Sequence, residues 1–541
     1  MLRRTALCLL FATILFAWSA PTGRAVNSSY PDRPKLVLVL VIDQFRYDYL
    51  VRFRPLFARG GFNRLLEGGA VFTDCRYDYA TTMTGPGHAS LLTGAYPNVH
   101  GIIENNWYDR EAQREVYCVE DLHTRTVVSR EKASPSPGYS PQYLNASTLG
   151  DELRIASDFR AKVISISVKD RAAVLMGGRT PSAAYWYDVG SGRFVSSTYY
   201  MPTLPAWVDE FNQHSPISQY CGQKWQALPE TGGGNGKVLS EFEPSPGEPC
   251  PDQKFLEWLE NTPYMNRVEL SFASAAIRNE RLGQGPETDL LCLSLSVNDY
   301  IGHEFGPYSE EVADTTVRTD RDLATFFDSL DKVVGLDKVW IAFSADHGVA
   351  PSPAFVQAHR LGIGMAQPAT VRTAAEKALT EAYGPGPWIE DQDETYLFLN
   401  RETLKRRNVP EARAEAIAAE AAAAQPDVMA AFTRTQFLTG SLPRSPIARK
   451  AANSFNFKRS GDVLLVFMPY AVPSSSTTGS THGSPWNYDA QVPLIFWGSA
   501  FKAGWYATAC QPIDLAATLA ARLGLTQPSG TQGVPLVSVL R

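Results

Sequence analysis

The chain has 541 residues, of which 44% are hydrophobic and 20% are charged, and its formal net charge at pH 7 is −6. Such a composition is typical of a globular protein with a large core. The sequence has no run of basic residues of the kind that neutralises nucleic-acid phosphates, so we expect a small-molecule ligand and no nucleic-acid partner.

The N-terminus has the layout of a secretory signal peptide over residues 1–25. It reads MLRRTALCLLFATILFAWSA, in which two arginines precede an apolar run and then small residues. The run is short for a membrane span, and we expect cleavage between Ala20 and Ala25. A retained anchor is the alternative. No later segment is apolar enough to span a bilayer, so we expect a periplasmic or secreted protein, whose oligomeric state the sequence does not give.

Six cysteines remain once Cys8 leaves with the leader. Disulfides form in exported proteins, and the pairing cannot be read from sequence alone. We favour a bridge between Cys221 and Cys250, which bracket a Gly/Pro-rich loop. Cys292 lies inside the apolar run LLCLSLSV, where a buried free thiol is at least as plausible.

Short apolar runs recur along the chain and alternate with helical patterns. Continuous hydrophobicity is typical of strands covered on both faces, as in a parallel sheet. We therefore expect an α/β fold with a mostly parallel central sheet sandwiched by helices. The expected strands lie at 36–44, 162–168, 289–299, 338–348, 462–469 and 492–498, and the clearest helical patterns at 62–69, 315–335 and 512–525.

Two segments interrupt this alternation. Residues 181–268 are rich in Pro, Gly, Ser and aromatic residues, and residues 352–450 include an alanine-rich helical pattern. We interpret both as insertions, which could cover a site, in one catalytic domain spanning residues 26–541.

Acidic residues and histidines follow several of the expected strands. Ligands of parallel sheets bind beyond the carboxyl ends of the strands, so these side chains should converge. A single strand-end Asp is more often a helix cap or turn residue, but these residues together could hold two metal ions. Carboxylate and imidazole ligands suit zinc. Manganese or cobalt would accept the same ligands. The candidate ligands are Asp43, Asp299, His303, Asp346, His347 and His482.

The segment TTMTGPGHASLLTG, residues 81–94, places Thr84 before a Gly-Pro-Gly turn and a helical pattern. A threonine hydroxyl is a weak nucleophile unless something removes its proton. A metal ion bound to the Thr84 oxygen would lower its pKa without a neighbouring base. The alternative is an ordinary helix N-cap, a position that Thr favours.

With these residues identified, the chain resembles the alkaline phosphatase superfamily, and in particular its threonine-nucleophile, phosphate-irrepressible bacterial members. The resemblance implies an alkaline-phosphatase-like fold and two Zn²⁺ ions. One ion would be held by Asp43, Asp346, His347 and the Thr84 oxygen, and the other by Asp299, His303 and His482. The matching stretches are VIDQFRYD, TMTGPGHASLLTG, HGIIENNWYD, VKDR, SVNDYIGHEFGP, FSADHG and STHGSPWNYDAQVPL.

The resemblance also implies how phosphate is contacted. Monoesterases of the family use a Lys-x-Arg pair, matched here by Lys169 and Arg171, and an amide matched by Asn105, with Asn106 as the alternative register. A monoester carries more charge on its non-bridging oxygens than a diester, so added cationic donors favour monoesters. The competing interpretation of the Lys169/Arg171 pair is a solvated strand end.

The combined hypothesis is an exported two-zinc alkaline phosphatase of broad specificity. Thr84 would attack small-molecule phosphate monoesters and form a phosphothreonine intermediate, which water hydrolyses. The first alternative is a nucleotide pyrophosphatase or phosphodiesterase on the same fold. The second is a non-catalytic surface binding protein.

Overall fold

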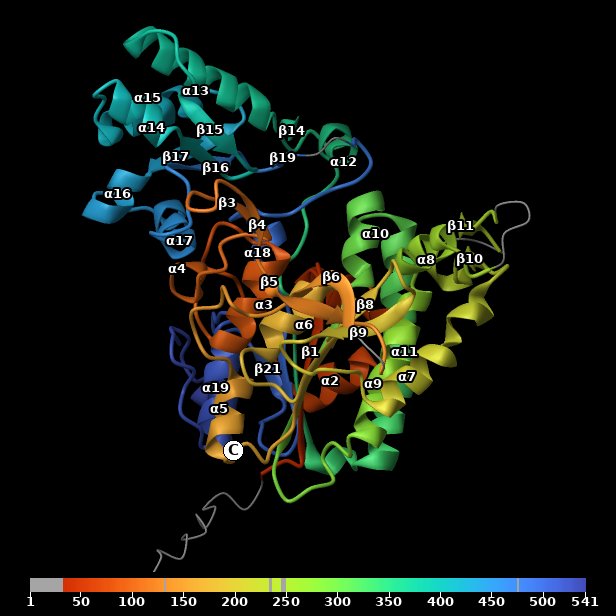
Figure 1. Ribbon diagram of the computed structural model, residues 1–541. Coiled ribbons are helices and arrows are strands. Elements are labelled where there is room, and N and C mark those ends of the chain that lie inside the picture. Colours follow the sequence, from red (N-terminus) through yellow and green to blue (C-terminus); the bar gives the residue numbers. More distant parts are fainter. Residues whose placement is uncertain (1–32, 131–132, 233–235, 245–249, 474–475) are drawn as a thin grey trace, which may run out of the picture.

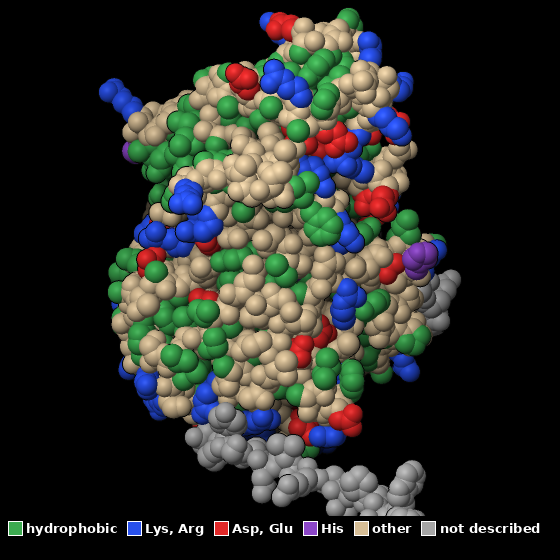
Figure 2. Space-filling model, turned by 90° about the vertical axis from the view of Figure 1, so that its left-hand side faces the viewer, with side chains coloured by type: hydrophobic (Ala, Val, Ile, Leu, Met, Phe, Trp, Pro, Cys, Tyr) green, Lys and Arg blue, Asp and Glu red, His purple; other side chains and the backbone are tan. Residues whose placement is uncertain are grey.

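The computed structural model describes residues 33–130, 133–232, 236–244, 250–473 and 476–541. The expected leader, residues 1–25, lies outside this part of the chain. None of the described helices combines the length and the apolar character needed to cross a bilayer. On the face shown in Figure 2, Lys and Arg side chains are interspersed with Asp and Glu.

The described residues form one large twisted sheet of eleven strands. Its middle strands β13, β1, β12, β7 and β8 run parallel, and antiparallel pairs occur toward both edges. In spatial order the strands are β21 (Gly504–Tyr506), β2 (Gly69–Phe72), β20 (Leu494–Trp497), β13 (Val339–Ser344), β1 (Leu36–Ile42), β12 (Asp289–Leu295), β7 (Val163–Ser167), β8 (Ala183–Asp188), β9 (Arg193–Ser197), β5 (Glu120–Val127) and β6 (Ala133–Tyr139).

Helices cover both faces of this sheet (Figure 1). Alternate side chains of β1 enter two different cores, Leu38 and Leu40 on one face and Val37 and Val39 on the other. All seven residues of β1 are buried, which explains why the strand is continuously hydrophobic. One face packs against α1 (Tyr47–Arg52), α2 (Phe62–Gly68), α7 (Ala206–Gln213), α9 (Tyr264–Asn279), α10 (Val297–Phe305) and α11 (Glu310–Val333); the other packs against α3 (Thr84–Thr93), α5 (Leu149–Ala156), α6 (Asp170–Gly177) and α19 (Asp514–Leu523).

A second, smaller α/β unit lies beyond one end of the large sheet (Figure 1). Its four-stranded antiparallel sheet has a core of its own. The segment 352–450 supplies most of the unit, but β18 comes from the apolar run at 462–469, which therefore does not join the central sheet as expected. The strands are β15 (Ile389–Gln392), β16 (Tyr396–Leu399), β18 (Val463–Phe467) and β17 (Val428–Thr433), with helices α13 (Pro368–Tyr383), α14 (Arg401–Arg406), α15 (Glu411–Ala423), α16 (Arg434–Thr439) and α17 (Pro446–Ser454).

The segment 181–268 differs from a simple insertion because it begins with β8 and β9 of the large sheet. The remainder forms α7, α8 (Gln253–Glu260) and a hairpin of β10 (Lys224–Gln226) and β11 (Val238–Glu241). The expected disulfide between Cys221 and Cys250 is confirmed, and Cys292 is a buried free thiol.

Shorter elements complete the described chain. Several lie near the carboxyl ends of the central strands, where they help to build the site. They are α4 (Pro97–His100), β3 (Asn106–Asp109), β4 (Arg114–Tyr117), α12 (Pro353–Ala358), β14 (Gly364–Met365), β19 (Ala471–Val472) and α18 (Asn487–Ala490), with the 3₁₀ turns η1 (Arg54–Leu56), η2 (Pro216–Tyr220), η3 (Pro229–Thr231), η4 (Leu336–Lys338) and η5 (Val537–Val539).

Candidate active site

Three buried carboxylates meet at the carboxyl ends of neighbouring parallel strands. Asp43 directly follows β1, Asp346 follows β13, and Asp299 lies in the first turn of α10 just after β12. Because β12, β1 and β13 are adjacent and parallel, their ends lie at the same edge of the sheet. The structure therefore brings together acids that are far apart in the sequence.

The first ligand group consists of Asp43, Asp346 and His347. His347 Nε2 lies 3.4 Å from Asp43 Oδ1 and 3.2 Å from Asp346 Oδ2. Both of these carboxylate oxygens are buried and have no hydrogen-bond partner among the described residues. Buried charged oxygens without a partner are costly, and a bound cation would satisfy them.

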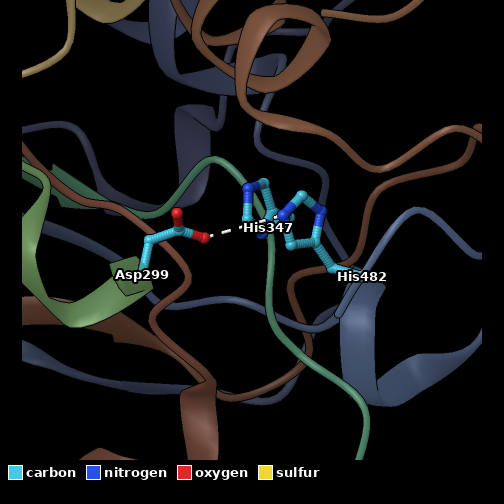
Figure 3. A group of neighbouring side chains, drawn as sticks. All are labelled: Asp299, His347 and His482. Atoms are coloured by element: carbon cyan, nitrogen blue, oxygen red, sulfur yellow. Dashed lines mark ion pairs between the residues drawn. The ribbon is translucent and has the colours of Figure 1, made fainter. Parts of the chain in front are cut away.

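The second ligand group is built around Asp299. Its Oδ1 lies 3.3 Å from His303 Nε2 and 3.6 Å from His482 Nε2. The ring of His347 stacks on that of His482 with the centroids 3.6 Å apart, so the two groups adjoin. Figure 3 shows Asp299, His347 and His482 directed toward one another from separate segments, and their ligand atoms lie within 4.8 Å of each other.

The three imidazoles share one orientation. In each, Nδ1 lies against a backbone carbonyl oxygen to which it can donate a hydrogen bond, and Nε2 faces the carboxylates. This arrangement leaves the Nε2 lone pair for a metal ion and is common among metal-binding histidines. The bonds run from His303 to Ser480 at 2.8 Å, from His347 to Gly348 at 2.9 Å and from His482 to Thr82 at 2.9 Å.

The pKa shifts in the first ligand group reflect the close approach of its two carboxylates. Burial raises the pKa of Asp43 well above its usual value, and Asp346 raises it further. Burial alone would lower the pKa of His347, but the carboxylates, Asp346 foremost, outweigh it and raise this pKa to about 9. A site of this charge attracts cations, and its carboxylate and imidazole donors fit zinc.

Thr84 is the first residue of α3 and is buried beside the first ligand group. Its Oγ1 lies 3.4 Å from His347 Nε2. His88, one turn later, donates from Nδ1 to the Thr84 carbonyl oxygen at 2.8 Å and lies 2.8 Å from Ser294 Oγ through Nε2. His88 thus anchors the start of α3 to β12, and burial lowers its pKa to about 4, which keeps it neutral.

Asn105 contacts the helix that begins at Thr84. Its Oδ1 accepts a hydrogen bond of 2.8 Å from the Gly85 backbone N–H. Asn106 begins β3 and is exposed, with its backbone paired to Tyr117. Of the two registers, the structure places Asn105 beside the Thr84 turn.

Lys169 and Arg171 flank the start of α6. Lys169 is buried, and its Nζ lies 2.7 Å from Asp43 Oδ2 and 2.5 Å from Asp299 Oδ2, so it bridges the two ligand groups. Arg171 donates from Nη1 to the Tyr117 hydroxyl at 3.3 Å, and its Nε is buried without a partner among the described residues. A solvated strand end is therefore the wrong description of Lys169.

A cavity of about 460 Å³ opens onto the second ligand group. His303, His482 and Asn105 line the cavity, together with residues 391–394, which form the end of β15 and the turn that follows it. The sequence suggested a cover from segment 352–450 but not which residues reach the site. Burial raises the pKa of Asp393 in this wall to about 7.

Comparison with known proteins identifies the family. A model described as type I phosphodiesterase/nucleotide pyrophosphatase matches residues 37–485. The chain belongs to this family. It is 35% identical to alkaline phosphatase PafA of Elizabethkingia meningoseptica over 539 residues, covering 96% of this chain and 97% of PafA. It is also 35% identical to alkaline phosphatase PhoV of Synechococcus elongatus over 555 residues, covering 99% of each.

The fold agrees with these relatives. The crystal structure of wild-type PafA matches with a TM-score of 0.85 at 33% identity, covering 94% of this chain and 99% of PafA. The expected alkaline-phosphatase-like fold and the resemblance to this superfamily are thereby confirmed. Together the family and its named members support a phosphoesterase activity for the chain.

Proposed function

We propose that the protein is an exported, two-zinc alkaline phosphatase that hydrolyses phosphate monoesters of broad structure. The observation that carries this proposal is the placement of Lys169, whose buried ammonium lies between the two ligand groups. A substrate phosphate at this position would gain a charged donor in addition to the metal ions, which favours a monoester dianion.

The ligands of the two zinc ions would be the groups described above, with Thr84 Oγ1 completing the first. Bound zinc supplies Lewis-acid stabilisation of the nucleophile and of the departing oxygen. The residues support this role because carboxylate oxygens and imidazole Nε2 atoms converge in both groups, and in the first group Asp43 Oδ1 and Asp346 Oδ2 have no hydrogen-bond partner among the described residues.

The chain's own residues then perform two displacements. Thr84 Oγ attacks phosphorus, the ester P–O bond breaks, and the alcohol leaves. Lys169, Arg171 and the Asn105 amide nitrogen hold the non-bridging oxygens, and the N-terminus of α3 favours their negative charge. Water then attacks the phosphothreonine, the bond to Oγ breaks, and inorganic phosphate is released.

The test compares catalytic efficiency for an aryl phosphate monoester and the matched methyl aryl diester. We expect a strong monoester preference in the wild type. Replacing both Lys169 and Arg171 by Ala should lower monoester kcat/KM by about 100-fold or more, and diester kcat/KM much less, because each lost donor weakens transition-state stabilisation. Thr84→Ala should abolish turnover of both esters.

Arg160 and Lys162 provide the control pair. They have the same spacing but more exposed side chains, at 61% and 41% of full exposure. Replacing both by Ala should leave the two efficiencies near those of the wild type. Equal losses for monoester and diester in the Lys169/Arg171 variant would refute the assignment.

A phosphodiesterase or nucleotide pyrophosphatase is the second candidate, because the matching family model carries that description. A wild-type preference for the diester in the same assay would establish it and would leave Lys169 without a role in substrate choice.

A further inference from the structure

Gln44 is a buried residue with an unusual backbone at the end of β1. It directly follows Asp43, has no exposed surface and adopts a φ of 58°. A non-glycine residue in this left-handed region is disfavoured and persists only where its surroundings hold it.

The residue contacts a carboxylate in each ligand group. Its backbone N–H donates to Asp346 Oδ1 at 3.1 Å, and its side-chain Nε2 donates to Asp299 Oδ1 at 2.7 Å. The first bond engages Asp346 Oδ1, which also accepts from the His347 backbone N–H at 3.0 Å, so Oδ2 remains directed at the His347 ring. The second bond fixes the oxygen on which His303 and His482 converge.

The surroundings of Gln44 keep this arrangement in place. Asn298 Nδ2 donates to the carbonyl oxygens of Asp43 at 3.3 Å and of Gln44 at 3.0 Å. Gly302 on α10 leaves room for the side chain, because a Cβ there would lie only 1.8 Å from Gln44 Oε1. Helix α10 thus holds the left-handed turn, through the hydrogen bonds of Asn298 and the space left by Gly302.

We propose that Gln44 is a positioning residue that couples the two ligand groups and sets their relative placement. It acts through Asp346 and Asp299 rather than by touching substrate, and the inference rests on the proposed two-zinc function. Partners that orient metal ligands in this way typically contribute about 10- to 100-fold to metal affinity or activity.

Gln44→Gly tests the proposal cleanly. Glycine adopts positive φ without strain, so of the two hydrogen bonds to carboxylates the variant keeps the backbone bond to Asp346 and loses the side-chain bond to Asp299. Zinc affinities are measured by competition with a chromophoric chelator, alongside kcat/KM for an aryl phosphate. We expect one of the two zinc affinities to fall by about 10-fold or more, with kcat/KM partly restored by excess zinc.

Gln113→Gly is the matched control, because Gln113 also has a left-handed φ of 51° but is exposed. It should bind two zinc ions and turn over substrate like the wild type. Gly302→Ala, which displaces the Gln44 side chain, should reproduce the loss of Gln44→Gly. Thermal unfolding of each zinc-free variant shows whether it is folded.

The outcomes separate the two claims. Wild-type zinc affinities and kcat/KM in a folded Gln44→Gly variant would overturn the positioning role while leaving the proposed function intact. A wild-type protein that binds fewer than two zinc ions or does not hydrolyse monoesters would overturn the proposed function itself.

Discussion

His100 is a buried residue behind the site whose protonation makes the stability of the folded protein depend on pH. It ends α4 and has no exposed surface. The Ile102 backbone N–H donates to its Nδ1 at 3.1 Å, so Nε2 carries the hydrogen and donates to Ser90 Oγ at 3.0 Å. Burial, with a smaller effect of Arg459, lowers its pKa to about 3.

This shift predicts an acid-sensitive contribution to stability. Below pH 6.5 the unfolded chain protonates His100, whereas the folded protein does so only near pH 3. The unfolded state therefore binds more protons in this window, and the free energy of unfolding falls by up to about 1.4 kcal/mol per pH unit as the pH falls. In His100→Gln this component of the decrease should disappear.

The measurement is denaturant unfolding of the wild type and His100→Gln at pH 7 and pH 5. The variant should lose less stability between the two pH values than the wild type does. The exposed His214, replaced by Gln, is the control and should keep the wild-type decrease. Equal decreases in all three proteins would contradict the role of His100.

Most residues of the candidate site could be predicted from their side-chain chemistry and their positions after the expected strands. Asp and His residues after strands predict a metal site, and the parallel sheet brings these residues together. The role of Gln44 could not be predicted from the sequence. The identity of the residue after Asp43 reveals neither its left-handed φ nor its hydrogen bonds to two residues more than 250 positions away. Tyr117 was missed likewise, since its contact with Arg171 depends on how β4 folds back.

The helix α3 carries Thr84 and is buried along its whole length. At Gly87 it approaches the end of β13 so closely that a Cβ would lie 2.3 Å from the Asp346 backbone oxygen. Glycine is needed at this position because the contact is with backbone, which cannot move aside as a flexible side chain could. The close approach holds Thr84 against the first ligand group.

Gly87→Ala should therefore push α3 away from β13. We expect kcat/KM to fall by about 10- to 100-fold, since displacements near 1 Å at a reacting group have effects of this size, and the unfolding temperature to fall as well. Gly285→Ala, where no atom lies within 4 Å of the added Cβ, is the control. An unchanged kcat/KM in Gly87→Ala would contradict the prediction, because it would show that α3 accommodates the added Cβ.

The elements themselves were predictable to different degrees. Strands β1, β7, β12 and β13 follow from continuous apolar runs, because both faces of each strand are buried. The run that forms β18 has the same character but belongs to the small sheet. Hydrophobicity reports that a strand is buried and not which sheet it joins.

In the whole molecule, segments that follow strands of the large sheet carry five of the six candidate ligands, and residues of the smaller α/β unit, which lies beyond one end of that sheet in Figure 1, line part of the cavity. This division explains why the cavity lining was harder to predict than the two candidate ligand groups. Strand ends are fixed by the topology of the sheet. Residues 391–394, at the end of β15 and in the turn after it, reach the cavity only because the smaller unit packs on the larger one.

In the proposed mechanism, hydrolysis proceeds by two displacements through Thr84. The most direct test is the stereochemical course of phosphoryl transfer from an isotopically chiral phosphate monoester to an acceptor alcohol. Each in-line displacement inverts the configuration at phosphorus, so two displacements should give net retention. Net inversion would show a single displacement and would contradict a phosphothreonine intermediate.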